Sequence, residues 1–87
     1  MYAVRFLDQA TQDLSSLDRS ISRRAIERLN WLSSNFEQIR PETLGADLSG
    51  LYKFRVGDYR IIYQTIEEEQ TILIHAIGHR REIFKKR

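Results

Sequence analysis

The first 40 residues place hydrophobic side chains at helical spacing behind one short strand. Residues Tyr2–Leu7 are rich in β-forming side chains and predict a strand. Asp8 then caps a short helix, and Asp18 or Ser20 caps a longer helix that runs to about Asn35. The apolar positions are Ala10, Leu14 and Leu17 in the first helix, and Ile21, Ala25, Leu29, Leu32 and Phe36 in the second. These stripes predict a helical hairpin with one face turned to a core.

After a loop marked by Pro41 and by residues 45–50, the pattern changes from helical to extended. Three β-branched and aromatic segments follow, over Leu51–Val56, Tyr59–Ile66 and Thr71–Ile77. A short helix is expected over residues 81–86. The order β-α-α-β-β-β predicts one α+β domain over residues 1–87, with the helical hairpin packed on a mostly antiparallel four-stranded sheet.

The Gly57-Asp58 pair predicts the register of the central hairpin. Glycine at the first central position is typical of a two-residue type II′ turn. Because strand side chains alternate, one face collects Tyr52, Phe54, Val56, Tyr59, Ile61 and Tyr63, and the other collects Lys53, Arg55, Arg60 and Ile62. We expect the aromatic face to pack under the helices.

On the second face, this register sets Arg55 directly across from Arg60, with Lys53 beside them. Like charges in that position repel and destabilise a hairpin. The arrangement favours an anion between the cations, and phosphate matches the fork of an arginine side chain. The alternative is a solvated sheet face on which the long side chains splay apart.

Composition narrows the class of protein. The chain has 87 residues, a net charge of +2 and no cysteine, so disulfides and thiolate metal sites are excluded. His75 and His79 lack a nearby carboxylate set, and we expect neither metal nor cofactor. The last eight residues hold five cations against Glu82, which indicates a polyanionic partner or a solvated basic tail. No membrane span or signal peptide is evident, so a cytoplasmic location is expected.

Three blocks of the chain resemble the RelE family of the RelE/ParE toxin superfamily. They are Tyr52-Lys53-Phe54-Arg55, Tyr59-Arg60-Ile61-Ile62-Tyr63 and Gly78-His79-Arg80-Arg81-Glu82-Ile83-Phe84. The resemblance spans almost the whole chain, and it implies the toxin of a type II toxin–antitoxin pair. Such toxins are metal-independent endoribonucleases that cut messenger RNA, many of them in the ribosomal A site, through attack by the 2′-hydroxyl. The expected partners are a cognate antitoxin, messenger RNA and the ribosome.

The same resemblance implies roles for individual residues. Lys53 and Arg55 match the basic pair of the second strand, Arg60 matches the arginine that steadies the phosphate, and Arg80 matches the arginine near the leaving group. Lys53 is a candidate base or phosphate ligand, because neighbouring cations can lower the pKa of a lysine. The expected RNA-binding residues are Arg81, Phe84, Lys85 and Lys86.

One position departs from the family pattern. Phe84 falls where the family has its catalytic tyrosine, so its ring can stack on a base but cannot move a proton. His79 titrates near neutrality and is the candidate replacement acid or base, with an exposed strand-end histidine as the alternative. His75, in mid-strand, is interpreted as structural, and Tyr52, Tyr59 and Tyr63 as core residues.

Two other functions stay open at this point. A ParE-like toxin, which inhibits DNA gyrase, has the same fold and generally lacks the basic catalytic set. Lys53, Arg55, Arg60 and Arg80 favour the ribonuclease, whereas the missing tyrosine favours the gyrase inhibitor. A weakened toxin that serves mainly as an antitoxin partner in a repressor complex is the third possibility.

Overall fold

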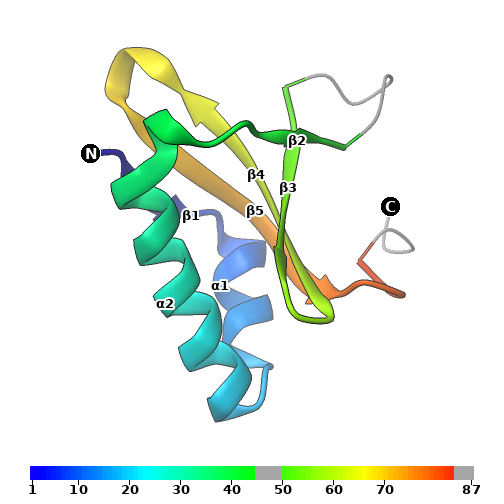
Figure 1. Cartoon of the computed structure of the whole chain (residues 1–87). Coiled ribbons are helices and arrows are strands. Elements are labelled where there is room, and N and C mark those ends of the chain that lie inside the picture. Colours follow the sequence, from blue (N-terminus) through cyan, green and yellow to red (C-terminus); the bar gives the residue numbers. More distant parts are fainter. Residues whose placement is uncertain (45–49, 84–87) are drawn as a thin grey trace.

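The computed structural model describes residues 1–44 and 50–83, as two helices packed on one sheet (Figure 1). The helices are α1 (Asp8–Ser15) and α2 (Arg19–Asn35). The strands are β1 (Ala3–Phe6), β2 (Glu42–Thr43), β3 (Tyr52–Val56), β4 (Tyr59–Ile66) and β5 (Thr71–His79). Single 3-10 turns span Phe36–Gln38 and Glu67–Glu69. The predicted α+β class is confirmed, and β1, α1, α2, β3, β4 and β5 follow one another in the predicted order.

The sheet has five strands in the order β1-β5-β4-β3-β2, so the expected count of four is wrong. The additional strand is β2, in which Glu42 pairs with Lys53 and Thr43 with Tyr52. A strand of two residues is too short to show an alternating pattern, so the sequence did not predict it. The pair β1–β5 is parallel and the other pairs are antiparallel, as expected for a mostly antiparallel sheet.

The core lies between the two helices and one face of the sheet (Figure 1). From α2 come Ala25, Leu29 and Leu32, all on the predicted stripe. They pack in one cluster with Ala10 of α1 and with Val56, Ile61, Tyr63, Ile72, Ile74 and Ile77 of the sheet. The opposite face of the sheet carries no helix among the described residues.

The start of α1 differs from the prediction that Asp8 caps it. The N-cap residue is Leu7, which has extended backbone angles and donates its N–H to the carbonyl of Ile74. Strand β1 therefore runs directly into α1, and Asp8 is the first helical residue, where its charge still suits the positive end of the helix dipole. Asp18 occupies the N-cap of α2 as predicted, without a side-chain capping bond.

The central hairpin has the predicted register. Gly57 has φ +60°, and Asp58 is not among the residues with positive φ, as a type II′ turn requires. Arg55 pairs with Arg60. Strand β5 continues two residues beyond Ile77, to His79. Residues 81–83 form a turn, and the rest of the predicted C-terminal helix lies outside the described residues.

Candidate functional site

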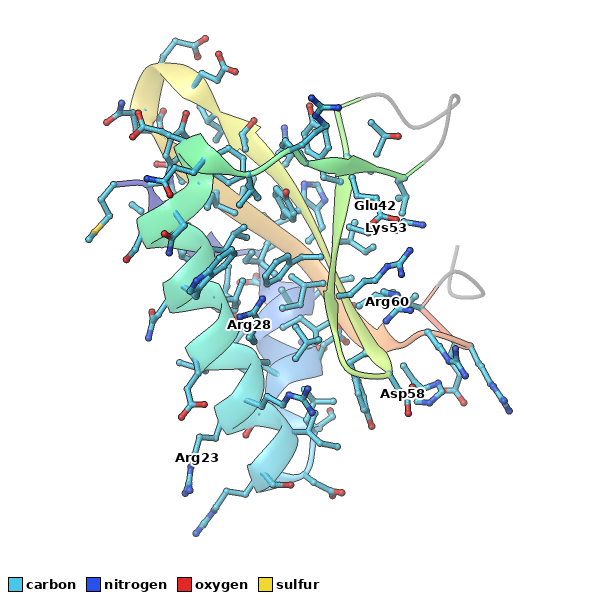
Figure 2. All side chains as sticks on the ribbon, viewed as in Figure 1. Arg23, Arg28, Glu42, Lys53, Asp58 and Arg60 are labelled. Atoms are coloured by element: carbon cyan, nitrogen blue, oxygen red, sulfur yellow. The ribbon has the colours of Figure 1, made fainter. Side chains whose placement is uncertain are left out.

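The side of the sheet that faces away from the helices is here called the open face. It carries Lys53 and Arg55 from β3, Arg60, Ile62 and Gln64 from β4, and His75 and Gly78 from β5. Alternation places these residues except His75, because the neighbouring residues Val56, Ile61, Tyr63 and Ile77 are buried in the core on the other side. His75 lies at the register shift of β5 and bonds to Gln64 of this face. Figure 2 shows Lys53 and Arg60 projecting from the sheet on the side opposite α2.

Two of the predicted site residues converge on one carboxylate. Glu42 Oε2 lies 3.0 Å from Arg55 Nη2 and 3.4 Å from Lys53 Nζ. The hydrogen bond from Arg55, together with the charges of Arg55 and Lys53, lowers the pKa of Glu42 below its ordinary value. The carboxylate is therefore ionised at neutral pH. Figure 2 shows Glu42 and Lys53 side by side where β2 meets β3.

Arg60 and Arg80 gather at a second place, the turn between β3 and β4. The Arg60 guanidinium donates to the carbonyls of Gly57, at 3.0 Å, and Tyr59, at 2.9 Å. Arg80 donates its backbone N–H to the Asp58 carbonyl at 2.8 Å, and its Nε lies 3.8 Å from the Asp58 carboxylate. The open face thus has two cationic centres, each with its own acidic residue.

Arg55 and Arg60 are directly opposed on neighbouring strands, yet their side chains point to different acceptors. Arg55 turns toward Glu42 on β2, whereas Arg60 turns toward the hairpin turn. The side chains splay apart, and each guanidinium has an acceptor inside the protein. Glu42 was missed in the sequence because β2 has no periodic pattern; its position beside Pro41 carries no chemical signal.

The C-terminal turn closes over the open face beside Arg60. Gly78, the partner of Arg60 on β5, has no side chain, and a Cβ placed there would lie 3.0 Å from Ile83 Cδ1. Ile83 is 5% exposed, so the glycine lets it seat directly on the strand. Arg81 is exposed in this turn. The other predicted RNA-binding residues, Phe84, Lys85 and Lys86, lie outside the described residues.

The two histidines lie on opposite sides of the sheet. His79 pairs with Tyr59 on the helix side, where the two rings meet edge to face at 5.4 Å. Its Nδ1 accepts the backbone N–H of Arg81 at 3.2 Å. His75 instead lies on the open face, bonded to Gln64, and burial lowers its pKa. The candidate acid or base His79 is therefore not brought together with Lys53 and Arg60, whereas His75 shares their face.

The tyrosines belong to the core side, as predicted. Tyr63 is fully buried, and its hydroxyl is the one buried side-chain polar atom without a hydrogen-bond partner in the described part of the chain. Burial raises the pKa of Tyr63 to about 12. Tyr52 contacts the Tyr63 ring at 5.6 Å, and Tyr59 contacts His79. All three side chains thus lie on the helix side of the sheet, away from the face that carries Lys53 and Arg60.

A pocket of about 270 Å³ opens at the edge of the sheet, between α2 and β3. Trp31, which is 42% exposed, lies parallel to Phe54 with ring centroids 6.4 Å apart. The Arg28 guanidinium lies 4.7 Å from the Trp31 ring centre and 5.3 Å from that of Phe54, close enough for cation–π attraction. The Trp31 ring thus packs against Arg28 and Phe54 although it is partly exposed.

Residues 1–44 and 50–83 contain no group of three or more acidic or histidine side chains placed to hold a metal ion. Within the same residues, neither helix has the length and apolar character needed to cross a membrane.

Comparisons with known proteins agree on one group of relatives. A family profile described as the ParE toxin of type II toxin–antitoxin systems, parDE, matches residues 4–84. The toxin RelG of Mycobacterium tuberculosis is 30% identical over 86 residues, which cover 98% of each chain. A putative RelE-like toxin protein of Escherichia coli is 29% identical over 84 residues, covering 91% of this chain and 83% of that protein.

Solved structures lead to the same group. The RelBE2 toxin–antitoxin complex of M. tuberculosis contains a chain that superposes with a TM-score of 0.81 at 30% identity, covering 93% of both chains. The isolated RelE toxin of E. coli superposes with a TM-score of 0.77 at 20% identity, covering 99% of this chain and 94% of that one. At 20% identity the likeness concerns the fold alone.

Proposed function

This chain belongs to the RelE/ParE family of toxins from type II toxin–antitoxin systems, and from that premise we propose that it is a metal-independent endoribonuclease that cuts messenger RNA on the ribosome. In the proposed reaction the 2′-hydroxyl attacks the adjacent phosphorus, and the bond to the 5′-oxygen breaks. The products are a 2′,3′-cyclic phosphate and a free 5′-hydroxyl. DNA lacks the attacking group and is not a substrate.

The observation that carries this proposal is the shared carboxylate oxygen of Glu42. Arg55 and Lys53 both reach it, at 3.0 and 3.4 Å, so two cations already converge on a single oxyanion. A phosphate oxygen presents the same negative charge and accepts the same hydrogen bonds. An RNA phosphate that displaces Glu42 therefore meets Lys53 and Arg55 in a geometry that needs little rearrangement.

The second cationic centre can stabilise the negative charge that develops in the same reaction. Arg60 and Arg80 lie together at the β3–β4 turn, within one strand of Arg55. Charge that develops on the phosphoryl oxygens in the transition state is stabilised by cations held in place beforehand. Arg55, Arg60 and Arg80 keep their charge at all ordinary pH values and serve as electrostatic clamps. Lys53 adds a proton that can be transferred.

A second candidate function is inhibition of DNA gyrase. It is favoured by the ParE description of the matched family profile and by the core placement of Tyr52, Tyr59 and Tyr63. A toxin that keeps only its antitoxin-binding role is the third candidate. The three functions differ in what they do to RNA, DNA topology and the antitoxin.

One experiment separates these candidates. The toxin is added to a bacterial translation extract, and the message is read by primer extension. We expect discrete cuts from the wild type. Arg60→Ala should lower the cleavage rate by roughly 100- to 1,000-fold, as expected when a transition-state charge contact is lost. Arg23→Ala, an exposed arginine on α2 far from the open face in Figure 2, is the matched control and should cut normally.

The other outcomes point to the other functions. An intact message together with blocked supercoiling by purified gyrase would identify the gyrase inhibitor. An intact message and active gyrase, with a stable antitoxin complex, would identify the weakened toxin. Wild-type cleavage by Arg60→Ala would mean that the reaction takes place away from this arginine.

A further inference from the structure

His75 reaches the open face through an irregularity in β5. Ile62 pairs with Ala76 and Tyr63 pairs with Ile74, so His75 is an extra residue with no partner of its own on β4. Such a bulge re-aims side chains and keeps the rest of the strand in register. Here it leaves Ile74 and Ile77 in the core, while His75 bonds to Gln64 on the face that carries Ile62 and Lys53.

Gln64 fixes which nitrogen of His75 carries the proton. The carboxamide oxygen Oε1 of Gln64 lies 2.6 Å from Nε2 of His75. An amide oxygen only accepts hydrogen bonds, so Nε2 is the donor and the lone pair stands on Nδ1. Burial also lowers the pKa of this imidazole from 6.5, which favours the neutral form at physiological pH. His75 is thus an oriented imidazole with one nitrogen ready to accept a proton.

The strand order sets His75 across β4 from Lys53. Lys53 on β3 pairs with Ile62, and Ile62 pairs with Ala76, the residue next to His75. Neighbouring strands lie about 4.8 Å apart, so the backbones of Lys53 and His75 are separated by about 10 Å. Between them, Ile62 is 6% exposed and offers no competing hydrogen-bonding group. Ile62 thus separates Lys53 from His75 without a side-chain group that could hydrogen-bond to either of them.

That spacing suits an in-line attack on phosphorus. The attacking and leaving oxygens lie on opposite sides of the phosphorus, so the group that takes a proton and the group that supplies one must also lie on opposite sides. A phosphate held over Ile62 would have the Lys53 side chain on its β3 side and the His75 side chain on its β5 side. His79 lies on the helix side of the sheet, where its ring contacts Tyr59.

We propose that His75 is the general base of the ribonuclease reaction, an inference that rests on the function proposed above. Nδ1 of His75 takes the proton of the 2′-hydroxyl while the 2′-oxygen forms its bond to phosphorus. The bond to the 5′-oxygen breaks, and that oxygen takes a proton from the Lys53 ammonium group. Solvent then returns the proton from His75 to Lys53, and both groups regain their starting state.

Charged groups from every neighbouring strand face this site. Arg5 on β1 pairs with Glu69 at 3.8 Å, Lys53 and Arg55 on β3 share Glu42 of β2, and Arg60 lies on β4. Gln64, the direct partner of His75, is uncharged at any pH. Of the described groups named here, His75 is the imidazole, and because burial lowers its pKa it gains its charge on the acid side of the ordinary histidine value.

The test measures cleavage as a function of pH. Ribosomes programmed with a defined message receive the toxin, and the single-turnover rate is measured from about pH 5.5 to about pH 8.5. The wild-type rate should be level near neutrality and fall at low pH, because a protonated imidazole cannot accept a proton. His75→Asn should slow cleavage by roughly 100- to 10,000-fold and remove the fall at low pH. Added imidazole should restore part of the rate to His75→Ala, which a structural role does not explain.

A second variant tests the orientation by Gln64 without touching the base. Gln64→Leu should keep the fall at low pH but lower the rate, by about tenfold, because Nδ1 no longer holds the lone pair in every molecule. Gln12→Leu, an exposed glutamine on α1, is the matched control. Thermal unfolding and antitoxin binding report whether each variant is folded.

The possible failures are distinct. If wild-type toxin leaves the message intact at every pH, the proposed ribonuclease function fails, and this inference fails with it. If the wild type cuts and His75→Asn keeps the wild-type rate and pH profile, the ribonuclease stands and His75 is not its base. If His79→Asn, and not His75→Asn, removes the fall in rate at low pH, then His79 is the group that takes the proton and the proposal is overturned.

Discussion

At the level of single side chains, Glu42 competes with any phosphate that binds the open face. It is held by Arg55 and Lys53, and its side chain is 44% exposed, so it can be displaced into solvent. A loose internal counterion of this kind relieves the repulsion between neighbouring cations while RNA is absent. It also weakens RNA binding by the free energy needed to displace it.

Removing the charge of Glu42 should therefore strengthen RNA binding. We expect Glu42→Gln to tighten the Kd for a single-stranded RNA by about two- to fivefold, measured by fluorescence anisotropy at low salt. Glu69→Gln removes the same charge beside Arg5 on β1 and is the matched control; it should change the Kd less. Weaker binding by Glu42→Gln would show instead that Glu42 holds Arg55 and Lys53 in the binding geometry.

The pH dependence of this effect follows from the direction of the Glu42 shift. Its folded-state pKa lies below the ordinary value of 4.5, so its ion pairs stabilise the fold above that value. This contribution is lost as pH falls through the lowered pKa. The difference in RNA affinity between wild type and Glu42→Gln should thus be constant near neutrality and vanish only in acid.

At the level of elements, α1 contacts the part of β5 that β1 does not pair with. Strand β1 pairs with residues 71–74 only, so the later part of β5 has no strand on that side. Asp13, 7% exposed on α1, accepts the backbone N–H of Ile77 at 3.0 Å. Gln9 donates to the other carboxylate oxygen at 2.8 Å. This contact fixes the stretch of β5 that carries His75 and leads into Arg80.

Loss of that carboxylate should destabilise the protein. We expect Asp13→Ala to lower the free energy of unfolding by about 1–3 kcal/mol, because the buried N–H of Ile77 loses its acceptor. Asp13→Asn keeps an acceptor oxygen and should lose less. Urea unfolding gives the stabilities, and hydrogen exchange at the Ile77 amide reports the contact directly. Equal exchange in all three proteins would place the stabilising role of Asp13 elsewhere.

At the level of the whole molecule, the helices cover one face of the sheet, and within residues 1–44 and 50–83 no helix covers the cationic face. The chain is a toxin of a type II toxin–antitoxin system, and structural relatives such as RelBE2 of M. tuberculosis are toxin–antitoxin complexes. Binding of an acidic segment that folds as it docks is a common way to cover such a surface.

Co-expression tests the partner. We expect the product of the neighbouring open reading frame to form a stable complex with the toxin and to restore growth. The complex should no longer bind the single-stranded RNA, because the open face is covered. Growth arrest that persists in the presence of a stable complex would mean that the antitoxin binds elsewhere and leaves the site accessible. High expression of the toxin alone without any effect on growth would contradict the toxin activity itself.

The sequence by itself determined the two helices, the four longer strands and the two faces of the central hairpin. A strand repeats every two residues, so the alternation from Tyr52 to Tyr63 separates aromatic from basic side chains whatever surrounds them. Gly57 is suited to the positive φ of the turn, and the turn sets the pairing of Arg55 with Arg60. These features are local, because they depend on backbone geometry within a few residues.

The tertiary structure decided what each side chain meets. Glu42 reaches Lys53 through a two-residue strand that no pattern marks, and Asp13 reaches Ile77 across 64 positions of the chain. The directions of the Arg55 and Arg60 side chains follow from acceptors brought in by other segments. The bulge that brings His75 to the open face arises where β5 must fit both β4 and the core. Such contacts join residues that are distant in the chain, so they depend on how the whole molecule packs and are not encoded in any short stretch of sequence.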